Sequence, residues 1–469
     1  NADDAGARKL CLVVDENGFG IPKKSLELNQ HSLLTEEMNN WQGSALWIFN
    51  DAVFTDKDFE SLLKLGVGGK SKDYTKIGRF GIGINVSFHL TDLVSFVSGE
   101  YIAFLDPSEK FLPKTGNPPR HARGKRINFL KNDFKNRFKN QTEPYISLAR
   151  NLSNENASIF KEFKEFDFTK KFNGTLFRIP LRNEKTAQNS EILQELFHPR
   201  DILQIFGEIK GNQEMLFLRN IEYCSLQFLK GKSRQMIWEA KIENMDPTLR
   251  NNRLSSSSCV QQIFQLEMEM NNRDRKSSEI WLVCTDGKDK NSVGDLETFS
   301  INNNIRARGG IASLLARSDN KSLARLKKDK FPNPPIPMLT GTLYSFLSLP
   351  ITTFLNVHIN GTFYISSDRR NMLQSENNSI LNGKSKSNSL GDNWNKHILF
   401  EILPQLHATL LERVAELDYQ QFLMFQPDQV SQYNPITTTR LWPIVNGLPG
   451  IYKTYAEKVL MKLYNGNFK

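Results

Sequence analysis

A glycine-rich stretch in the first fifth of the chain has the composition of a phosphate-binding loop. From Lys76 to Gly83 it reads Lys-Ile-Gly-Arg-Phe-Gly-Ile-Gly, and an apolar segment follows it directly. Glycines at this spacing let the backbone turn sharply and bring its N–H groups close to a phosphate. A helix starting there would add the positive end of its dipole. Such turns also occur without any ligand, so the stretch alone leaves a phosphate cradle and a plain turn open.

Three polar residues elsewhere in the chain could complete a nucleotide site. Asn1 offers an amide oxygen, which is a suitable ligand for a magnesium ion held by phosphates. Asp51 follows a short apolar run, where its carboxylate could accept a hydrogen bond from an exocyclic amine. Thr175 comes after Gly174 and could support Asp51 through its hydroxyl. Singly each residue has an ordinary structural explanation, but together and in this order they indicate a nucleotide pocket.

The elements that must position these residues follow from the pattern of apolar residues. In the first part of the chain we expect helical residues at 1–7, 56–65 and 145–170, strands at 9–14, 45–49 and 174–180, and a hairpin over 94–105. Further along we expect a helical pattern over 190–207, strands at 215–218, 263–268, 280–284, 340–347 and 354–359, and a long amphipathic helix at 394–419.

Composition indicates a globular chain of two or three domains without a membrane span. It has 469 residues, of which 24% are charged, and its mean hydropathy is −0.46. No apolar run approaches the roughly 20 residues that a bilayer span needs. The four cysteines are scattered without metal-binding spacing, which favours buried thiols in a reducing compartment. The chain has no charged-then-apolar leader, and starting at Asn1 it reads as cut within an element.

The segment from 110 to 140 is basic and interrupted by prolines, which is typical of an insertion or lid. The chain has a net charge of +10 and a pI near 9.2, so nucleic acid is one partner to consider. However, Phe134 and Phe138 recur at helical spacing within the basic run, and their rings are expected to face a core. A solvated basic face is therefore favoured, with a nucleic-acid site as the alternative.

Several stretches taken together resemble the ATPase region of the sacsin family. They are 1–7, 43–51, 76–83, 95–99, 174–180, 355–363 and 366–370. This family is a branch of the gyrase, heat-shock chaperone, histidine kinase and MutL ATPase superfamily, near the ninety-kilodalton heat-shock chaperone. The resemblance implies an α+β chain. A two-layer α/β sandwich of the Bergerat ATP-binding type (1–185) would precede an α/β middle domain (186–375), then a mobile loop and a helical C-terminal segment (376–469).

The resemblance also assigns roles to individual residues. Asn1 would bind Mg²⁺, Asp51 would read the adenine amino group of ATP, and Thr175 would back Asp51. The other residues implied at the nucleotide or its lid are Asp4, Ala5, Lys70, Gly78, Arg79, Phe80, Gly81 and Gly83.

A catalytic arginine is implied by the stretch from Arg370 to Gln374. It resembles the chaperone's middle-domain catalytic loop, whose arginine touches the terminal phosphate and stabilises charge in the transition state. Arg370 is the candidate, and Arg369 is the second choice. The alternative is an ordinary pair of surface arginines beside a loop.

The sequence departs from the superfamily pattern in two places. The general base is expected at a glutamate four positions before the magnesium-binding asparagine, and that position would precede Asn1, so ATP binding is expected while hydrolysis stays open. No glycines follow Asp51, and the side chains of Ala52 and Phe54 would make the adenine loop stiffer and bulkier.

These observations rank three functions. The first is an ATP- and Mg²⁺-binding chaperone or co-chaperone module in the cytoplasm. Its expected partners are client proteins and seventy-kilodalton heat-shock chaperones, and its expected assembly is a homodimer. The second is an interaction scaffold whose nucleotide fold has decayed. The third is a nucleic-acid-associated ATPase of the same superfamily, motivated by the basic run.

Overall fold

The computed structural model describes most of the chain, and every structural statement below concerns the described part. The described residues are 1–18, 32–63, 84–116, 120–131, 133–153, 161–207, 213–243, 245–255, 259–270, 275–290, 295–303, 305–319, 339–366, 372, 390–423, 441–448 and 450–466. The glycine stretch 76–83, Lys70, Arg369, Arg370 and residues 376–389 of the expected mobile loop lie outside these residues.

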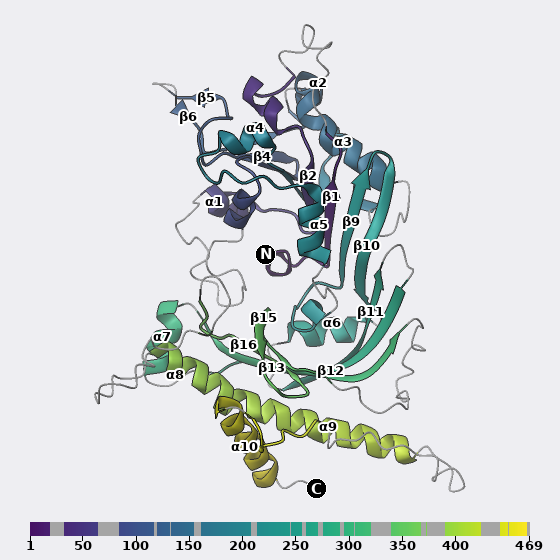
Figure 1. Cartoon of the computed structure of the whole chain (residues 1–469), viewed down its shortest axis with the longest axis vertical. Helices are drawn as coiled ribbons and strands as arrows, with labels where there is room; N and C mark the ends of the chain where they lie inside the picture. Colours follow the sequence, from purple (N-terminus) through teal and green to yellow (C-terminus); the bar gives the residue numbers. More distant parts are fainter. Residues whose placement is uncertain are drawn as a thin grey trace.

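One mixed sheet of fourteen strands runs through the molecule (Figure 1). From one edge to the other its strands are β15 (Leu347–Thr352), β14 (Thr342–Ser345), β16 (His358–Gly361), β13 (Ala307–Asp319), β12 (Arg275–Lys290), β11 (Val260–Met270), β10 (Ser233–Ile242), β9 (Tyr223–Lys230), β1 (Lys9–Asp15), β2 (Ala45–Asn50), β8 (Phe172–Pro180), β3 (Val94–Gly99), β4 (Tyr101–Leu105) and β7 (Gly124–Asn128). A separate short pair is formed by β5 (Lys114–Thr115) and β6 (Arg120–His121).

Strand β1 joins the two halves of this sheet. It pairs antiparallel with β2 on one side and parallel with β9 on the other. The continuous apolar run of β1 suits a strand with neighbours on both edges and cores on both faces. The strands before residue 181 and those after residue 222 therefore form one continuous sheet. The pairing of β1 with β9 joins its two halves.

Helices cover the sheet on both faces. The α-helices are α1 (Asp56–Leu63), α2 (Phe134–Arg137), α3 (Lys139–Ser153), α4 (Glu184–Gln188), α5 (Pro199–Gly207), α6 (Pro247–Leu254), α7 (Asp295–Asn303), α8 (Leu390–His397), α9 (Leu403–Leu423) and α10 (Gly450–Asn465). Tighter 3-10 turns are η1 (Asp3–Ala5), η3 (Glu36–Trp41), η4 (Asn85–His89), η5 (Lys161–Phe163) and η6 (Gln213–Met215), and η7 (Ile398–Ile402) is a π turn.

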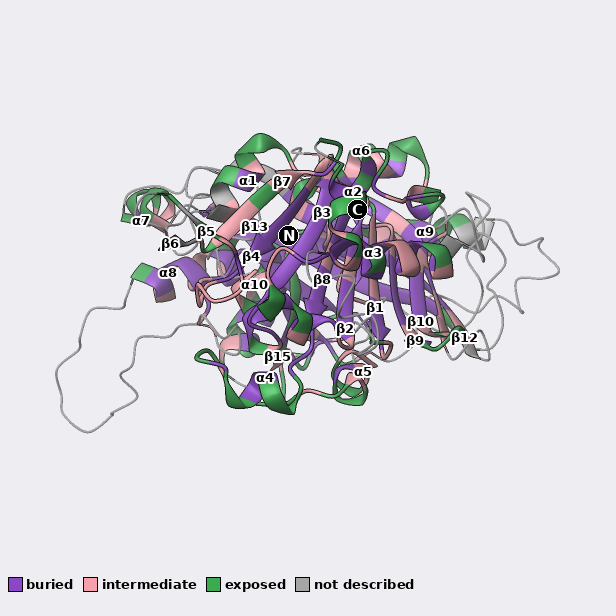
Figure 2. Ribbon diagram, turned by 90° about the horizontal axis from the view of Figure 1, so that it is seen from above, coloured by how far each residue is buried: buried purple, intermediate pink, exposed green. Residues whose placement is uncertain are grey.

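Alternation along β8 separates the two faces. Leu176 lies in a core with side chains of α3, whereas Phe177 packs with side chains of α1. We call the first the outer face and the second the inner face. The strands of the sheet are largely buried, and exposed residues concentrate on the surrounding helices and turns (Figure 2). In Figure 1 the sheet curves around the N-terminus, so that η1, α1 and α5 lie inside the curve.

The basic segment 110–140, expected to be an insertion or lid, contributes one strand to the large sheet and helical residues to its outer layer, while β5 and β6 form a separate pair. β7 extends the sheet beyond β4, and the residues of α2 pack against α3. Phe134 is buried and its ring lies 5.1 Å from that of Phe138, which confirms that these aromatics face a core.

The sequence-based assignment differs from the structure in the middle of the chain. Residues 215–218, expected to be a strand, follow η6 as a buried irregular segment, and α3 begins and ends earlier than the helix expected at 145–170. Between 190 and 207 only α5 is helical. The strands β9, β10 and β13 were not predicted. Polar side chains such as Gln227, Glu239 and Ser313 interrupt these strands, so they lack the continuous apolar runs from which most of the other strands were predicted.

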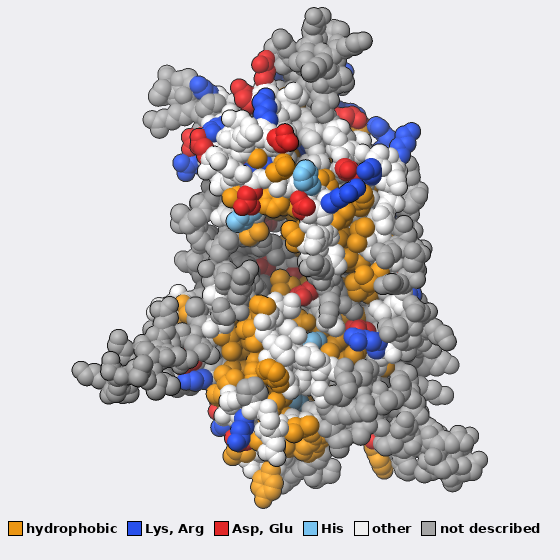
Figure 3. Space-filling model, viewed as in Figure 1, with side chains coloured by type: hydrophobic (Ala, Val, Ile, Leu, Met, Phe, Trp, Pro, Cys, Tyr) orange, Lys and Arg blue, Asp and Glu red, His pale blue; other side chains and the backbone are white. Residues whose placement is uncertain are grey.

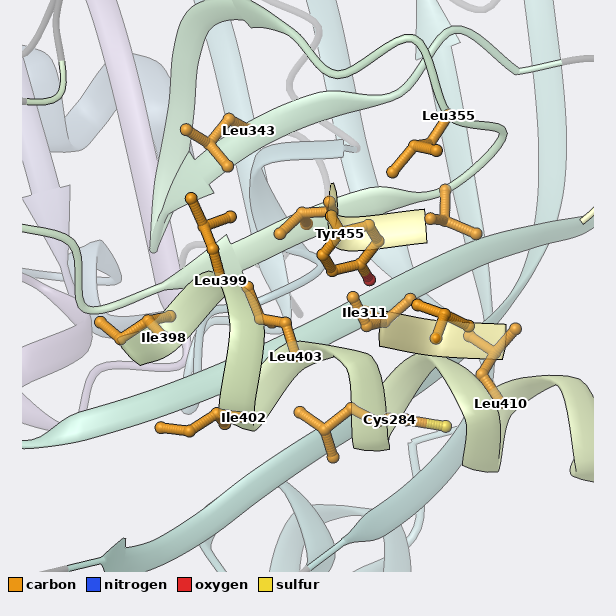
Figure 4. Close-up of a cluster of buried hydrophobic side chains, with 14 of the residues drawn as sticks. Cys284, Ile311, Leu343, Leu355, Ile398, Leu399, Ile402, Leu403, Leu410 and Tyr455 are labelled. Atoms are coloured by element: carbon orange, nitrogen blue, oxygen red, sulfur yellow. The ribbon is translucent and has the colours of Figure 1, made fainter. Parts of the chain in front are cut away.

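The C-terminal helices close the far end of the outer face. α8, η7 and α9 form one continuous helical run, as expected from the amphipathic pattern at 394–419. Leu399, Leu403 and Leu410 point into a cluster with Cys284 and Ile311 of the sheet (Figure 4). Pro404 is the second residue of α9, just after η7; it has no N–H to donate, and the widened π turn accommodates it.

Candidate functional site

The turn that carries Asn1 lies on the inner face, at the centre of the view in Figure 1. It is a 3-10 turn in place of the expected helix, closed by a hydrogen bond from the Ala5 N–H to the Asn1 carbonyl at 3.0 Å. Gly6 ends it with φ +78°, a conformation that suits glycine. Asn1 and Ala5 are exposed and Asp4 is half-buried, so their side chains are accessible on this face.

Asp51 ties the end of β2 to the residues that follow this turn. Its Oδ1 accepts hydrogen bonds from the backbone N–H groups of Arg8, at 2.7 Å, and Lys9, at 2.9 Å. The sequence predicted that Asp51 and the Asn1 stretch belong to one site, and the residues that Asp51 contacts directly follow that stretch. The contact runs through the backbone at the start of β1, and it fixes one carboxylate oxygen of Asp51.

Thr175 supports the chain at Ala52, the residue that follows Asp51. It lies opposite Asn50 in the β2–β8 register, and its hydroxyl donates to the carbonyl oxygen of Ala52 at 2.7 Å. The expected hydroxyl contact with the Asp51 carboxylate is thus replaced by a contact with the loop that follows Asp51. Gly174 is required for this approach, because a Cβ there would lie 2.8 Å from the Asn50 carbonyl oxygen.

Ser98 is a site residue that the sequence reasoning missed. Its Oγ accepts the backbone N–H of Phe54 at 2.9 Å and lies 2.9 Å from the Thr175 Oγ1. Ser98 also donates to the Gly174 carbonyl at 3.1 Å. Ser98 is 1% exposed, and its hydrogen bonds hold the loop after Asp51 against β3 and β8. Its signal in the sequence was a small polar residue in β3, a signal that it shares with Ser95.

Phe54 anchors the loop after Asp51 to the inner face of the sheet. Its ring lies 5.0 Å from that of Phe96 and 5.2 Å from that of Phe59, which is on α1. This packing agrees with the stiffer and bulkier loop expected from the side chain of Phe54. The loop is held by packing and by the Ser98 hydrogen bond at the same point.

The turn that follows the glycine stretch is fixed by a buried ion pair. Arg182 is fully buried and pairs with Asp92, while its guanidinium also donates to the carbonyl oxygens of Phe88 and Thr91. These carbonyls lie in η4 and directly after it. Arg182 therefore holds the exit of the glycine stretch, although the stretch itself lies outside the described residues.

A magnesium ion at Asn1 would take most of its ligands from phosphate oxygens and water. In the described part of the chain, no group of three or more His, Cys, Asp or Glu side chains is placed to hold a metal. A single amide oxygen such as that of Asn1 is a ligand set that Mg²⁺ uses when substrate phosphates and water supply the rest.

The basic run near β7 is neutralised by its own neighbours. Arg126 pairs with Asp56 at 2.8 Å and lies over the rings of Phe59 and Tyr101. Lys135 pairs with Asp167 at 2.6 Å. Figure 3 likewise shows lysine and arginine side chains interspersed with acidic ones on the visible face. Arg126 and Lys135 are thus each paired with a carboxylate of a neighbouring segment.

No helix in the described ranges is long and apolar enough to cross a bilayer.

Comparison with known proteins supports the resemblance found in the sequence. Human sacsin is 25% identical over 438 residues, which cover 88% of this chain and 8% of sacsin. The chain thus spans a small part of that relative's length. A solved structure described as the N-terminal domain of a DNA repair protein aligns over 92% of this chain and 91% of its own, with 8% identity and a TM-score of 0.29. A TM-score this low supports no inference about fold or activity.

The family assignment rests on the N-terminal half. A sequence model of the Sacsin domain matches residues 1–240, just over half of the 469 residues. The matched region contains the Asn1 turn, Asp51, Ser98 and Thr175, which are the residues that the structure gathers on the inner face. The chain belongs to the Sacsin domain family.

Proposed function

We propose that this chain is a nucleotide-binding module of a sacsin-type protein, with the Bergerat-type arrangement on the inner face of its sheet. The observation that carries the proposal is the hydrogen-bonded corner around Asp51. It joins the start of β1 to Asp51 and joins Thr175 to Ala52, although the hydrogen-bonded residues lie 43 and 123 positions apart. Three segments that are distant in sequence thus meet at the end of one strand.

The chemistry of this corner suits an adenine nucleotide. The Oδ1 of Asp51 is committed to two backbone amides, so the carboxylate is held in a fixed orientation with Oδ2 as the oxygen for the adenine amino group. Asn1 would hold Mg²⁺, which would neutralise phosphate charge. Asp4 and Ala5 would line the base and sugar. Lys70, Gly78, Arg79, Phe80, Gly81, Gly83 and the arginines Arg370 and Arg369 keep the roles that the resemblance implies.

The role that follows for the module is in protein folding or quality control. As a chaperone or co-chaperone it would work in the cytoplasm with client proteins and seventy-kilodalton heat-shock chaperones, as a homodimer. Membership of the Sacsin domain family supports this role, and the nucleotide site would couple it to ATP.

Calorimetry of ATP binding with Mg²⁺ tests the site. Asp51→Asn keeps the shape of the side chain but loses its charge, and a hydrogen bond to a charged group contributes about 1.5–3 kcal/mol. We expect the affinity for ATP to fall at least about tenfold. The matched control is Asp167→Asn, which removes a carboxylate on the outer face that pairs with Lys135. Indistinguishable heats for wild type and Asp51→Asn would count against the site.

A nucleotide-independent scaffold is the second candidate, and one observation favours it. Phe54 fills the loop after Asp51 and packs on Phe59 and Phe96, which leaves this loop less room than glycines would. The scaffold predicts no magnesium-dependent nucleotide binding by wild type, and a Gly81→Ala variant whose affinity for a protein partner is unchanged.

A further inference from the structure

The segment 213–221, which leads into β9, is buried although most of it has no regular structure. Met215, Leu216, Phe217 and Ile221 are 0%, 3%, 6% and 1% exposed. A buried irregular backbone must find partners for its N–H and C=O groups, because water cannot reach them. Here two buried side chains of opposite charge supply those partners. One is Asp3 of η1 and the other is Arg253 of α6.

Asp3 supplies the acceptors from the side of the nucleotide site. Its Oδ1 accepts the backbone N–H of Asn220 at 2.7 Å and those of Arg219 and Ile221 at 3.1 Å each. Its own carbonyl oxygen accepts the Asn220 side chain at 2.8 Å. Asp3 is 5% exposed and lies in η1, two residues after Asn1. The position of the Asn1 turn is therefore set by segment 213–221.

Arg253 supplies the donors from the side of the middle strands. This residue of α6 donates through one nitrogen to the carbonyl oxygens of Leu218 at 2.7 Å and Ile221 at 3.0 Å. Burial lowers the pKa of Arg253 to about 10, and Asp3 is the strongest of the charges that oppose this shift. Asp3 and Arg253 thus hold the same short segment by its amides and its carbonyls.

The other end of the segment reaches the far edge of the sheet. Glu214 accepts hydrogen bonds from the backbone N–H of Ser348, at 3.0 Å, and from its hydroxyl. The ring of Phe217 lies 5.1 Å from that of Tyr344. It also covers Gly310 so closely that a Cβ there would lie 3.1 Å from the ring. One segment of nine residues therefore contacts the Asn1 turn, α6, β13, β14 and the edge strand β15.

We propose that Asp3 is a positioning residue for the magnesium side of the nucleotide site, and that segment 213–221 couples this side to β15. The inference rests on the proposed nucleotide function. Binding of Mg·ATP at Asn1 would restrict the motion of η1. Through the hydrogen bonds of Asp3, η1 would in turn restrict residues 219–221. The hydrogen bonds between Glu214 and Ser348 would extend this restriction to β15. Loss of Asp3 frees Asn1 without touching the Asp51 corner, so the base stays bound while the magnesium contribution is lost.

The first experiment compares nucleotide affinity with Mg²⁺ and with EDTA, using ATP as the probe. Positioning residues behind a metal ligand typically change metal affinity 10–100-fold. For Asp3→Asn we expect the gain in affinity from Mg²⁺ to fall at least about tenfold, with the affinity in EDTA unchanged. The matched control is Asp106→Asn, a buried carboxylate that accepts two loop amides, from Phe111 and Leu112, on the outer side. If folded Asp3→Asn gains as much ATP affinity from Mg²⁺ as wild type does, the positioning role is overturned.

The second experiment follows hydrogen exchange in the same proteins. Mg·ATP is expected to slow exchange at 219–221 and at 347–352 in wild type. Glu214→Ala removes both acceptor oxygens and lies outside the nucleotide corner, so it should keep ATP affinity while losing the slowing at 347–352. It also keeps the coupling testable if Asp3→Asn fails to fold. Slowing at 347–352 that persists in Glu214→Ala overturns the coupling.

Failure of the nucleotide function is recognised separately. If wild type binds no ATP, the proposed function falls, and the link through Asp3 is then decided by exchange in the ligand-free proteins. Faster exchange at both 219–221 and 347–352 in Asp3→Asn, but not in Asp106→Asn, supports the link. Equal exchange in these variants and wild type overturns it.

Discussion

At the scale of single residues, buried polar side chains decide where the backbone of the site lies. Asp51 accepts hydrogen bonds from two backbone N–H groups and Ser98 accepts one. Thr175 donates a hydrogen bond to a backbone carbonyl oxygen. None of these contacts joins side chains that are near in sequence. Each buried polar contact contributes little by itself, but an orphaned partner is costly, so such a corner tolerates few substitutions.

Ser98→Ala tests this corner at one atom. The change leaves the Phe54 N–H without its acceptor, and we expect a loss of about 1–3 kcal/mol in the free energy of unfolding. The freed loop should also bind ATP more weakly. Urea denaturation and calorimetry measure the two effects.

Ser95→Ala is the matched control for this experiment. Ser95 is on the same strand and 3% exposed, but its hydroxyl contacts Tyr145 on the outer face at 2.7 Å. We expect it to lower stability comparably and to leave ATP affinity intact. Equal losses of ATP affinity in both variants would show that Ser98 acts only through general stability.

At the scale of elements, the C-terminal helices are joined through one buried histidine. His407 of α9 contacts the Tyr455 hydroxyl of α10 at 3.1 Å and the Leu441 carbonyl oxygen at 3.2 Å. Burial lowers the pKa of His407 from 6.5 to about 4. Because the folded-state pKa lies below the unfolded one, the unfolded chain binds the proton more readily. Stability is therefore complete above pH 6.5 and falls as the pH drops towards 4.

The pH dependence gives the second prediction. Between pH 7 and pH 5, His407 should cost about 1–2 kcal/mol of stability, with α10 loosening first. Urea denaturation at both pH values measures the loss, and hydrogen exchange in 450–465 locates it. His407→Gln cannot titrate, so the difference in pH dependence between variant and wild type isolates this residue from the other six histidines. Identical pH dependence in the two proteins would contradict the assignment.

At the scale of the whole molecule, the continuous sheet bears on where the first folding unit ends. The boundary predicted at residue 185 would leave β1 without its neighbour β9. It would also expose the part of the inner core to which Ile221, Leu226 and Trp238 contribute, and each such side chain contributes about 1.5–3 kcal/mol when buried. An unpaired, apolar central strand is also an aggregation site.

Two truncated chains test this third prediction. A chain ending at Leu254 keeps β9, β10, Asp3 and Arg253 together, and we expect it to unfold cooperatively. A chain ending at Asn183 should be less stable by on the order of 5 kcal/mol and prone to aggregate. Circular dichroism with heating and size-exclusion chromatography distinguish the two. If the shorter chain is monomeric and melts at a similar temperature, the boundary near residue 185 stands.

The sequence by itself determined the family, the strands with clear apolar runs and the long C-terminal helix. These features are local: apolar periodicity within 5–20 residues, or short motifs such as those at Asn1, Asp51 and Thr175. The motifs also indicated that these three stretches belong to one site. The Sacsin domain match covers all of them.

Only the tertiary structure decided how that site is held. Asp3, Ser98, Arg182 and Arg253 act on backbone N–H and C=O groups of other segments, and a backbone group leaves no mark in the sequence. Strands β9 and β10 were missed because polar residues are interspersed with their apolar ones, so neither strand is one continuous apolar run. The parallel pairing of β1 with β9, which makes two sheets into one, joins residues more than 200 positions apart. Local pattern could not specify it, because its stability comes from contacts that exist only once the chain has folded.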